Sequence, residues 1–118
     1  MAAQRQLIAR SEELQDGGRG VRFEVQWHGE TAAAFAIRSH GTVHAYLNRC
    51  RHVPTELDWQ DGRFFDSSGQ LLICSLHGAL YQPDNGLCIA GPCHGLGLFK
   101  LRVAECDGQI YYLPETDI

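Results

Sequence analysis

Hydrophobic and polar residues alternate along the first third of the chain. Every second residue of 21–27 is apolar, which predicts a strand with one buried face. Residues 33–38 and 42–47 are predicted as two further strands. Because only short turns separate the three runs, we expect the strands to pair antiparallel. Before them, residues 11–17 predict one short helical turn with Ser11 as its N-cap.

The last part of the chain repeats this alternation. Residues 98–103 alternate between apolar and basic side chains, and residues 109–113 are predicted as a returning strand. Between them, Asp107-Gly108 is a strong signal for a two-residue hairpin turn. We therefore expect an antiparallel strand pair in this part of the chain.

Residues 48–95 have a different texture, with frequent Gly, Pro, Asp and Ser between short apolar runs. Residues 67–69 and 83–86 each mark a tight turn between two short strands. The aromatic residues interpreted as the core of this segment are Trp59, Phe64 and Phe65. Together the patterns predict an all-β chain of one domain with a loop-rich insert.

Composition narrows the class of protein. The 118 residues, 44% hydrophobic and 20% charged, are typical of one globular domain. The net charge of -4 argues against a nucleic-acid partner, and all cationic residues except Lys100 are arginines, which suit a protein partner better than a polyanion. There is no apolar stretch long enough to span a membrane, and the first residues lack a secretory signal. We therefore expect a cytoplasmic protein.

Five cysteines, an odd number in a chain expected to stay reduced, argue against a disulfide framework and favour metal binding. Two of them belong to mixed Cys/His motifs, Cys50-Arg51-His52 and Cys74-Ser75-Leu76-His77-Gly78. Three interpretations compete: packed cysteines with hydrogen-bonded histidines, a structural Cys₂His₂ zinc site, or an iron–sulfur centre. Zinc sites usually keep two Cys together and two His together, so the mixing within each loop argues against zinc.

The C-x-H and C-x-x-H-G pair resembles the cluster-binding loops of the Rieske family. The resemblance implies one [2Fe–2S] cluster per chain, with Cys50 and Cys74 on one iron and His52 and His77 on the other. Gly91-Pro92 is similar to the family's proline loop, which covers the cluster. The implied fold is an antiparallel β-sandwich or barrel base (about residues 1–47 and 96–118) with a small cluster-binding subdomain (about residues 48–95).

The resemblance also bears on the redox potential, which spans about -150 to +300 mV in Rieske centres. Thr55 and Leu76 occupy the positions of the two cysteines that join the two loops by a disulfide in high-potential members. Ala79 occupies the position of a serine donor, whereas Tyr81 matches a tyrosine donor. We therefore expect a midpoint near or below about 0 mV. The ferric ion should also lower the pKa of the ligand histidines, so the midpoint should fall with rising pH.

The resemblance implies a soluble ferredoxin-like carrier of single electrons, from a flavin reductase to a terminal oxygenase or another redox enzyme. It is not expected to be an enzyme, because no second site for mononuclear iron and no nucleotide fingerprint is visible in the sequence. Two alternatives remain: the small subunit of a nitrite-reductase-type complex, and a zinc-stabilised interaction module. The donor, the acceptor and the oligomeric state are not specified by the sequence.

Weaker candidates surround these motifs. Cys88, Cys93 and Cys106 are interpreted as packed or inert thiols, although the first two could also form a redox-active or ligand pair. The histidines expected to be exposed on the base are His28, His40 and His44. The residues that could line a docking edge are His94, Arg49 and Arg51.

Overall fold

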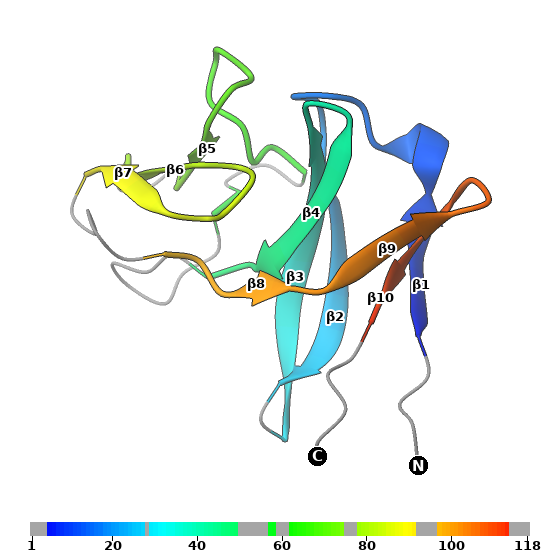
Figure 1. Cartoon of the computed structure of the whole chain (residues 1–118). Helices are drawn as coiled ribbons and strands as arrows, with labels where there is room; N and C mark the ends of the chain where they lie inside the picture. The colour runs from blue at the N-terminus through cyan, green and yellow to red at the C-terminus, as the bar shows by residue number, and fades with distance from the viewer. Residues whose placement is uncertain are drawn as a thin grey trace.

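The computed structural model describes residues 5–27, 29–49, 57–58, 62–74, 78–91 and 97–113. Within these ranges the chain forms three antiparallel sheets, which lie side by side as layers in Figure 1. The terminal sheet consists of β1 (Gln6–Arg10), β10 (Gln109–Tyr112) and β9 (Val103–Cys106). The central sheet consists of β2 (Val21–Trp27), β3 (Glu30–Ser39), β4 (Thr42–Leu47) and β8 (Lys100–Leu101). The small sheet consists of β5 (Leu72–Ile73), β6 (Leu80–Tyr81) and β7 (Cys88–Ala90).

At β3 the central sheet is buried on both faces, and the two faces carry side chains of different size. Ala34 and Ala36 of β3 belong to the base core, which lies toward the terminal sheet, whereas Phe35 and Ile37 belong to the insert core, which lies toward the small sheet. All four side chains have no exposed surface. The base core comprises Leu14, Val25, Ala32, Ala34, Ala36, Val43, Ala45, Leu47, Leu101, Ile110 and Tyr112. The insert core comprises Phe35, Ile37, Tyr46, Leu57, Phe64, Leu72, Cys74, Ala79, Tyr81, Cys88 and Leu98.

Most of the predicted strands are confirmed. The first and third strands have the predicted bounds, and the second extends to Glu30–Ser39. Asp107 and Gly108 join β9 to β10 with φ angles of 52° and 75°, as the hairpin signal required. The predicted strand 98–103 is instead divided at Arg102, because β8 pairs with β4 whereas β9 pairs with β10. The chain thus passes from the central sheet to the terminal sheet at this residue.

The predicted helical turn is shorter than expected, and its cap is different. A single 3-10 turn, η1, covers Ser11–Glu13, and Arg10 precedes it as the N-cap residue. The backbone N–H of Arg10 donates to the Glu13 carboxylate at 2.8 Å, so a residue inside the turn caps it, and Ser11 does not. Strand β1 was not predicted, because its exposed edge shows no clear alternation. Among the described residues, no helix is long and apolar enough to cross a membrane.

Candidate metal centre

The second predicted ligand loop begins at the end of β5. The Cys74 side chain is fully buried there, and its backbone N–H donates to the Ala79 carbonyl at 2.9 Å. The Gly78 N–H donates back to the Cys74 carbonyl at 2.8 Å, and Gly78 has a φ of 71°, a conformation that favours glycine. These bonds fix both ends of the loop that contains residues 75–77, which lie outside the described residues.

The start of the predicted proline loop packs directly against this second loop. Gly91 has a φ of 97°, and a Cβ atom added to it would lie 2.8 Å from the Cα atom of Ala79. Only glycine allows an approach this close. Ala79 and Tyr81 are both fully buried. Pro92 lies outside the described residues.

A buried polar network holds the base of the first predicted ligand loop. The Asn48 side chain donates to the Asp58 carboxylate at 2.9 Å and accepts from the Leu57 N–H at 2.8 Å. The same carboxylate accepts from the Gly62 N–H at 3.0 Å and lies 3.7 Å from Nε of Arg22. The network joins the two ends of the segment that contains Cys50 and His52. It therefore restrains the loop without a regular strand ladder.

Sequence reasoning missed this network. Asn48 stands two residues before Cys50, where the alternation of β4 ends, and Asp58 follows the apolar Leu57. A polar residue at the end of a strand was the only signal, and it does not reveal its partner ten positions away. Buried polar side chains need hydrogen-bond partners, so such a residue beside a ligand motif is worth examining.

Described residues next to both ligand loops belong to the insert core. Cys74 and Leu57, which follows the first motif, are both members of it, and Phe64 stacks on Phe35 with ring centroids 4.0 Å apart. The prediction that Phe64 belongs to the core of the insert is therefore confirmed, and Phe65 packs against the same core. The Tyr46 hydroxyl donates to the Pro83 carbonyl at 2.6 Å, and burial raises the pKa of this hydroxyl well above its usual value.

The remaining cysteines behave as packed or exposed thiols where the structure describes them. Cys88 is buried, and its thiol donates to the Ala90 carbonyl at 3.3 Å, which confirms it as a packed residue. Cys106 is exposed at the end of β9. These two and Cys74 are not in disulfides, and Cys93 lies outside the described residues.

The histidines expected to be exposed divide into two cases. His40 is exposed as expected, with a φ of 51° in the turn after β3. His44 is only half-exposed, so that expectation was wrong. Its partial burial lowers the pKa of the imidazole, and the nearby Lys100 ammonium lowers it further. Arg49 is exposed. The other candidates lie outside the described residues: His28, Arg51 and His94.

Of the four predicted ligands, the structure describes Cys74 alone. Cys50, His52 and His77 lie outside the described residues, as do Thr55, Trp59 and Leu76. The described surroundings fit an iron–sulfur cluster: a buried thiol at the foot of a glycine-closed loop, with the Gly91 backbone packed against that loop. Mixed thiolate and imidazole donors also suit such a centre. The assignment of the four ligands stays a prediction.

Comparison with known protein families gives one match. The family model described as Rieske [2Fe-2S] domain matches residues 4–104, which is most of the chain. A search of curated proteins gives no significant match.

Solved structures with a similar fold include two ferredoxins and one oxygenase. The ferredoxin of carbazole 1,9a-dioxygenase from Nocardioides aromaticivorans IC177 has a TM-score of 0.72 at 21% identity, and the match covers 96% of this chain and 100% of that chain. The Sphingomonas yanoikuyae B1 ferredoxin has a TM-score of 0.68 at 20% identity, with 95% and 100% covered. The terminal oxygenase of the Nocardioides system has a TM-score of 0.73 at 19% identity, with 98% of this chain but 31% of that chain covered.

Proposed function

The chain belongs to the Rieske [2Fe-2S] family, and from this premise we propose that it is a ferredoxin-like one-electron carrier. The observation that carries the proposal is the family match over residues 4–104, a range that contains both Cys/His motifs. The likeness to two ferredoxins over their whole length supports it. We propose that it takes electrons from a flavin reductase and passes them to a terminal oxygenase or a similar redox enzyme.

Cys50, His52, Cys74 and His77 would hold the cluster. A bound [2Fe–2S] cluster with two imidazole ligands supplies reversible one-electron transfer at a potential above that of an all-thiolate cluster. The residues of the chain provide the environment. The insert core keeps water away from the Cys74 thiol, and the network of Asn48 and Asp58 positions the loop that contains the first ligand pair.

The proposal extends to the organisation and location of the chain. Residues 48–95 would form the cluster-binding subdomain, and residues 1–47 and 96–118 the base that supports it. The small sheet and the insert core support this division. We place the protein in the cytoplasm, where thiols stay reduced, and the absence of disulfides among Cys74, Cys88 and Cys106 is compatible with that location.

Spectroscopy on the purified protein tests the cluster. Iron and zinc are counted on one sample, and visible and EPR spectra are recorded after anaerobic reduction with dithionite. We expect a red-brown protein with two irons per chain that bleaches on reduction and gives an average g value below that of the free electron. A colourless protein that contains zinc would contradict the proposal, because Zn²⁺ is d¹⁰ and has no redox chemistry.

A redox titration and a sizing column separate the carrier from the subunit alternative. The midpoint potential should lie near or below about 0 mV. When the protein is purified from its native host, it should elute from the sizing column without a large partner. A midpoint above about +150 mV would contradict the low-potential assignment. Constant co-elution with a large reductase subunit would support the nitrite-reductase-type alternative instead.

A further inference from the structure

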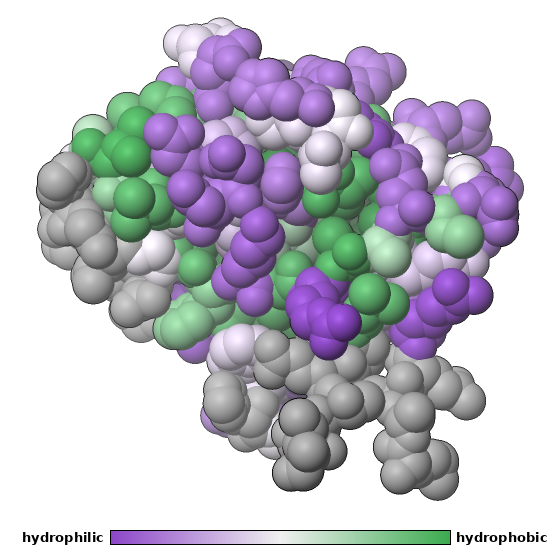
Figure 2. All heavy atoms as spheres, in the orientation of Figure 1, coloured by the Kyte–Doolittle hydropathy of each residue, from purple (hydrophilic) through white to green (hydrophobic). Residues whose placement is uncertain are grey.

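Charged side chains are distributed unevenly between the two ends of the molecule. The end formed by η1 and the β9–β10 turn carries four described acidic residues, Glu12, Glu13, Glu105 and Asp107. Figure 2 shows hydrophilic side chains covering this end, at the right of the view. Ser11 and Gly108 join the two elements through a backbone hydrogen bond of 2.9 Å. Arg10 and Arg38 form ion pairs with Glu12 and Glu105 at this end, so the four acidic and two basic side chains leave a net charge of -2 there.

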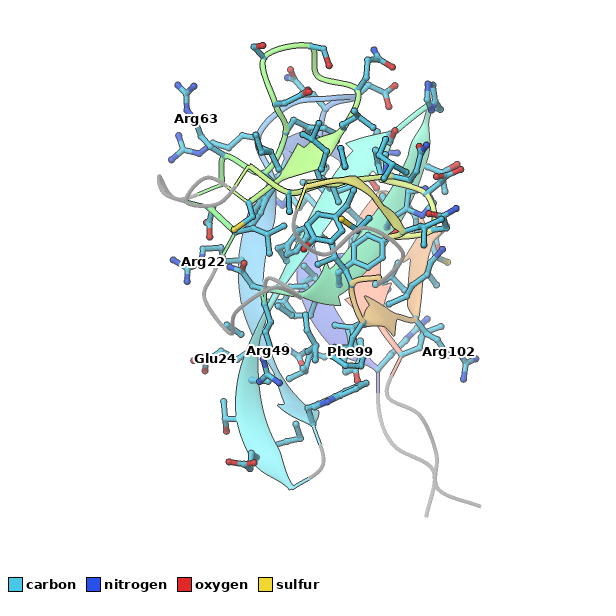
Figure 3. All side chains as sticks on the ribbon, turned by 90° about the vertical axis from the view of Figure 1, so that its left-hand side faces the viewer. Arg22, Glu24, Arg49, Arg63, Phe99 and Arg102 are labelled. Atoms are coloured by element: carbon cyan, nitrogen blue, oxygen red, sulfur yellow. The ribbon has the colours of Figure 1, made fainter. Side chains whose placement is uncertain are left out.

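The side that contains the small sheet and the candidate centre is rich in arginine instead. We call the set Arg22, Arg49, Arg63, Phe99 and Arg102 the arginine face. Figure 3 looks onto this side: Arg49 lies beside Phe99, Arg22 and Arg63 lie with Glu24 toward one edge, and Arg102 lies toward the opposite edge. All four arginines are exposed, and the Phe99 side chain is 37% exposed.

Arg49 and Phe99 lie together at the end of β4, next to the candidate centre. The Leu47 N–H donates to the Phe99 carbonyl at 3.0 Å, and the Arg49 N–H donates to the Leu47 carbonyl at 2.9 Å. Arg49 directly precedes the predicted ligand Cys50 in the chain. The Phe99 ring packs 5.9 Å from the Trp27 ring, measured between centroids, so an aromatic surface is held rigidly beside the arginine.

Arg22 forms an ion pair with Asp58 and so adds no net charge, and the positive charge of this face comes from Arg49, Arg63 and Arg102. Asp58, the partner of Arg22 at 3.7 Å, has no exposed side-chain surface, whereas the Arg22 side chain is 34% exposed. Glu24 is an acidic residue at one edge of this side. Arg51, Glu56 and Asp61 lie outside the described residues.

We propose that the arginine face is the docking surface for a redox partner whose own docking surface is acidic. The proposal rests on the proposed function and adds the chemistry of the partner. An exposed aromatic ring among arginines is a composition typical of protein interfaces. At about 0.1 M salt, charges are screened beyond about 10 Å. The molecule measures 41 × 31 × 22 Å, so the arginines near the centre outweigh the distant acidic end.

Small redox ions of opposite charge test the sign of this surface. The protein, already shown to contain its cluster, is reduced and then oxidised in a stopped-flow instrument by anionic hexacyanoferrate(III) or cationic tris(phenanthroline)cobalt(III). With the anion, we expect the rate to fall several-fold as ionic strength rises from about 0.05 to 0.5 M, because attraction is screened. A rate that rises with ionic strength, as the net charge predicts, would overturn the proposal.

Arg49→Gln and Arg102→Gln are compared with Arg10→Gln, which changes the net charge equally but lies next to η1, where Arg10 pairs with Glu12 at 3.5 Å. The two face variants should slow the anionic oxidant about two- to fivefold and accelerate the cationic one, whereas Arg10→Gln should change neither. Opposite changes exclude an altered driving force, which would move both rates in the same direction. Equal effects of all three variants would contradict a localised surface.

Poly-L-glutamate then serves as an acidic polypeptide probe. It should slow oxidation of the wild-type protein by hexacyanoferrate(III), and Arg49→Gln should weaken this inhibition, whereas poly-L-lysine should not inhibit. Inhibition that is unchanged in both face variants would place the acidic partner elsewhere and overturn the proposal. A protein without a cluster fails at the spectroscopic step, so failure of the proposed function is distinguishable from failure of the docking surface.

Discussion

The two faces of the central sheet carry cores that are held together in different ways. On the base side, small residues such as Ala34 and Ala36 pack beneath the terminal sheet, and long antiparallel ladders supply the order. On the insert side, large aromatic residues pack beneath strands of two or three residues. There, the buried hydrogen bond between Asn48 and Asp58 helps to fix the backbone, as the strand ladders do on the base side.

This difference has a consequence for function. Regular strands fix the backbone but leave little room for loops that must present ligands. Side-chain hydrogen bonds and close glycine contacts can hold irregular loops in place. The loss of any one of them then disturbs the whole loop. We therefore expect substitutions on the insert side to affect the cluster and those on the base side to affect stability alone.

The largest expected effect is that of Cys74→Ala. Loss of a thiolate ligand should abolish cluster binding, so iron content should fall to background. The matched control is Cys88→Ala, which removes another buried thiol of the insert core, one that donates to the Ala90 carbonyl. The control should retain its iron and EPR signal. Equal retention of iron in both variants would remove Cys74 from the ligand set.

Asp58→Ala should produce the next largest effect. It leaves the Asn48 amide and the Gly62 N–H buried without their acceptor, which should cost about 2–4 kcal/mol and speed iron release in urea. The comparison variant is Asp66→Ala, which removes a carboxylate that accepts from Ser68 in an exposed turn. Its effect should stay below about 1 kcal/mol. Similar rates of iron release in the two variants would contradict a special role for the buried network.

Gly91→Ala and Gly41→Ala separate backbone strain from close contact. Both glycines have positive φ, 97° and 80°, but an added Cβ would meet Ala79 at 2.8 Å in the first case and nothing within 4 Å in the second. Gly41→Ala should lower the free energy of unfolding by about 1 kcal/mol. Gly91→Ala should cost about twice as much and also shift the EPR g values, which Gly41→Ala should leave unchanged. Unshifted g values in Gly91→Ala would show that its contact does not reach the cluster.

The smallest effect concerns the base side. Arg38 of β3 contacts Glu105 of β9 through two hydrogen bonds of 3.0 and 2.6 Å, and the guanidinium lowers the pKa of this carboxyl. A depressed pKa stabilises the fold above the unfolded-state value, near about 4.3, and this contribution is lost as pH falls through the folded-state pKa.

Glu105→Gln should therefore lower the free energy of unfolding at pH 7 by about 1 kcal/mol, and less below about pH 4. Urea titrations at both pH values measure the difference. Glu12→Gln is the control, because its pair with Arg10 is 3.5 Å long and both side chains are more than 70% exposed, at 76% and 73%. A loss that is independent of pH would show that packing of Glu105, and not its charge, is what matters.

The base could be predicted from sequence more fully than the insert. The alternation of apolar and polar residues located β2 and β4, because a strand with one buried face has an apolar side chain at every second position. Asp107-Gly108 predicted the hairpin turn because both of its positions need a positive φ, which these residue types adopt. Alternation could not show that the run through Arg102 changes sheets, because either sheet accepts the same pattern. The lowered pKa of His44 likewise depends on its partial burial and on the charge of Lys100, which only the folded strands bring near it.

In the candidate centre, motif spacing predicted Cys74 as a ligand followed by a glycine, and the structure shows a buried Cys74 and a positive φ at Gly78. The spacing could not predict Asn48 and Asp58, because their pairing depends on how the chain returns after the first motif. As cluster ligands, Cys50, His52, Cys74 and His77 all stay predictions of the motif.

The unequal size of side chains on the two faces of β3 also protects the order of the layers. In many sheets, polarity rejects a shift of one residue in pairing, because a shift exchanges the buried and exposed faces. Residues Ala34 to Ile37 are apolar on both faces, so polarity offers no such safeguard. Here the difference in side-chain volume opposes such a shift. A shift would press Phe35 into the space of an alanine and would leave an alanine where the Phe64 ring now stacks on Phe35. The alternation of large and small residues thus fixes, by steric fit, which face of β3 packs against the base core and which against the insert core.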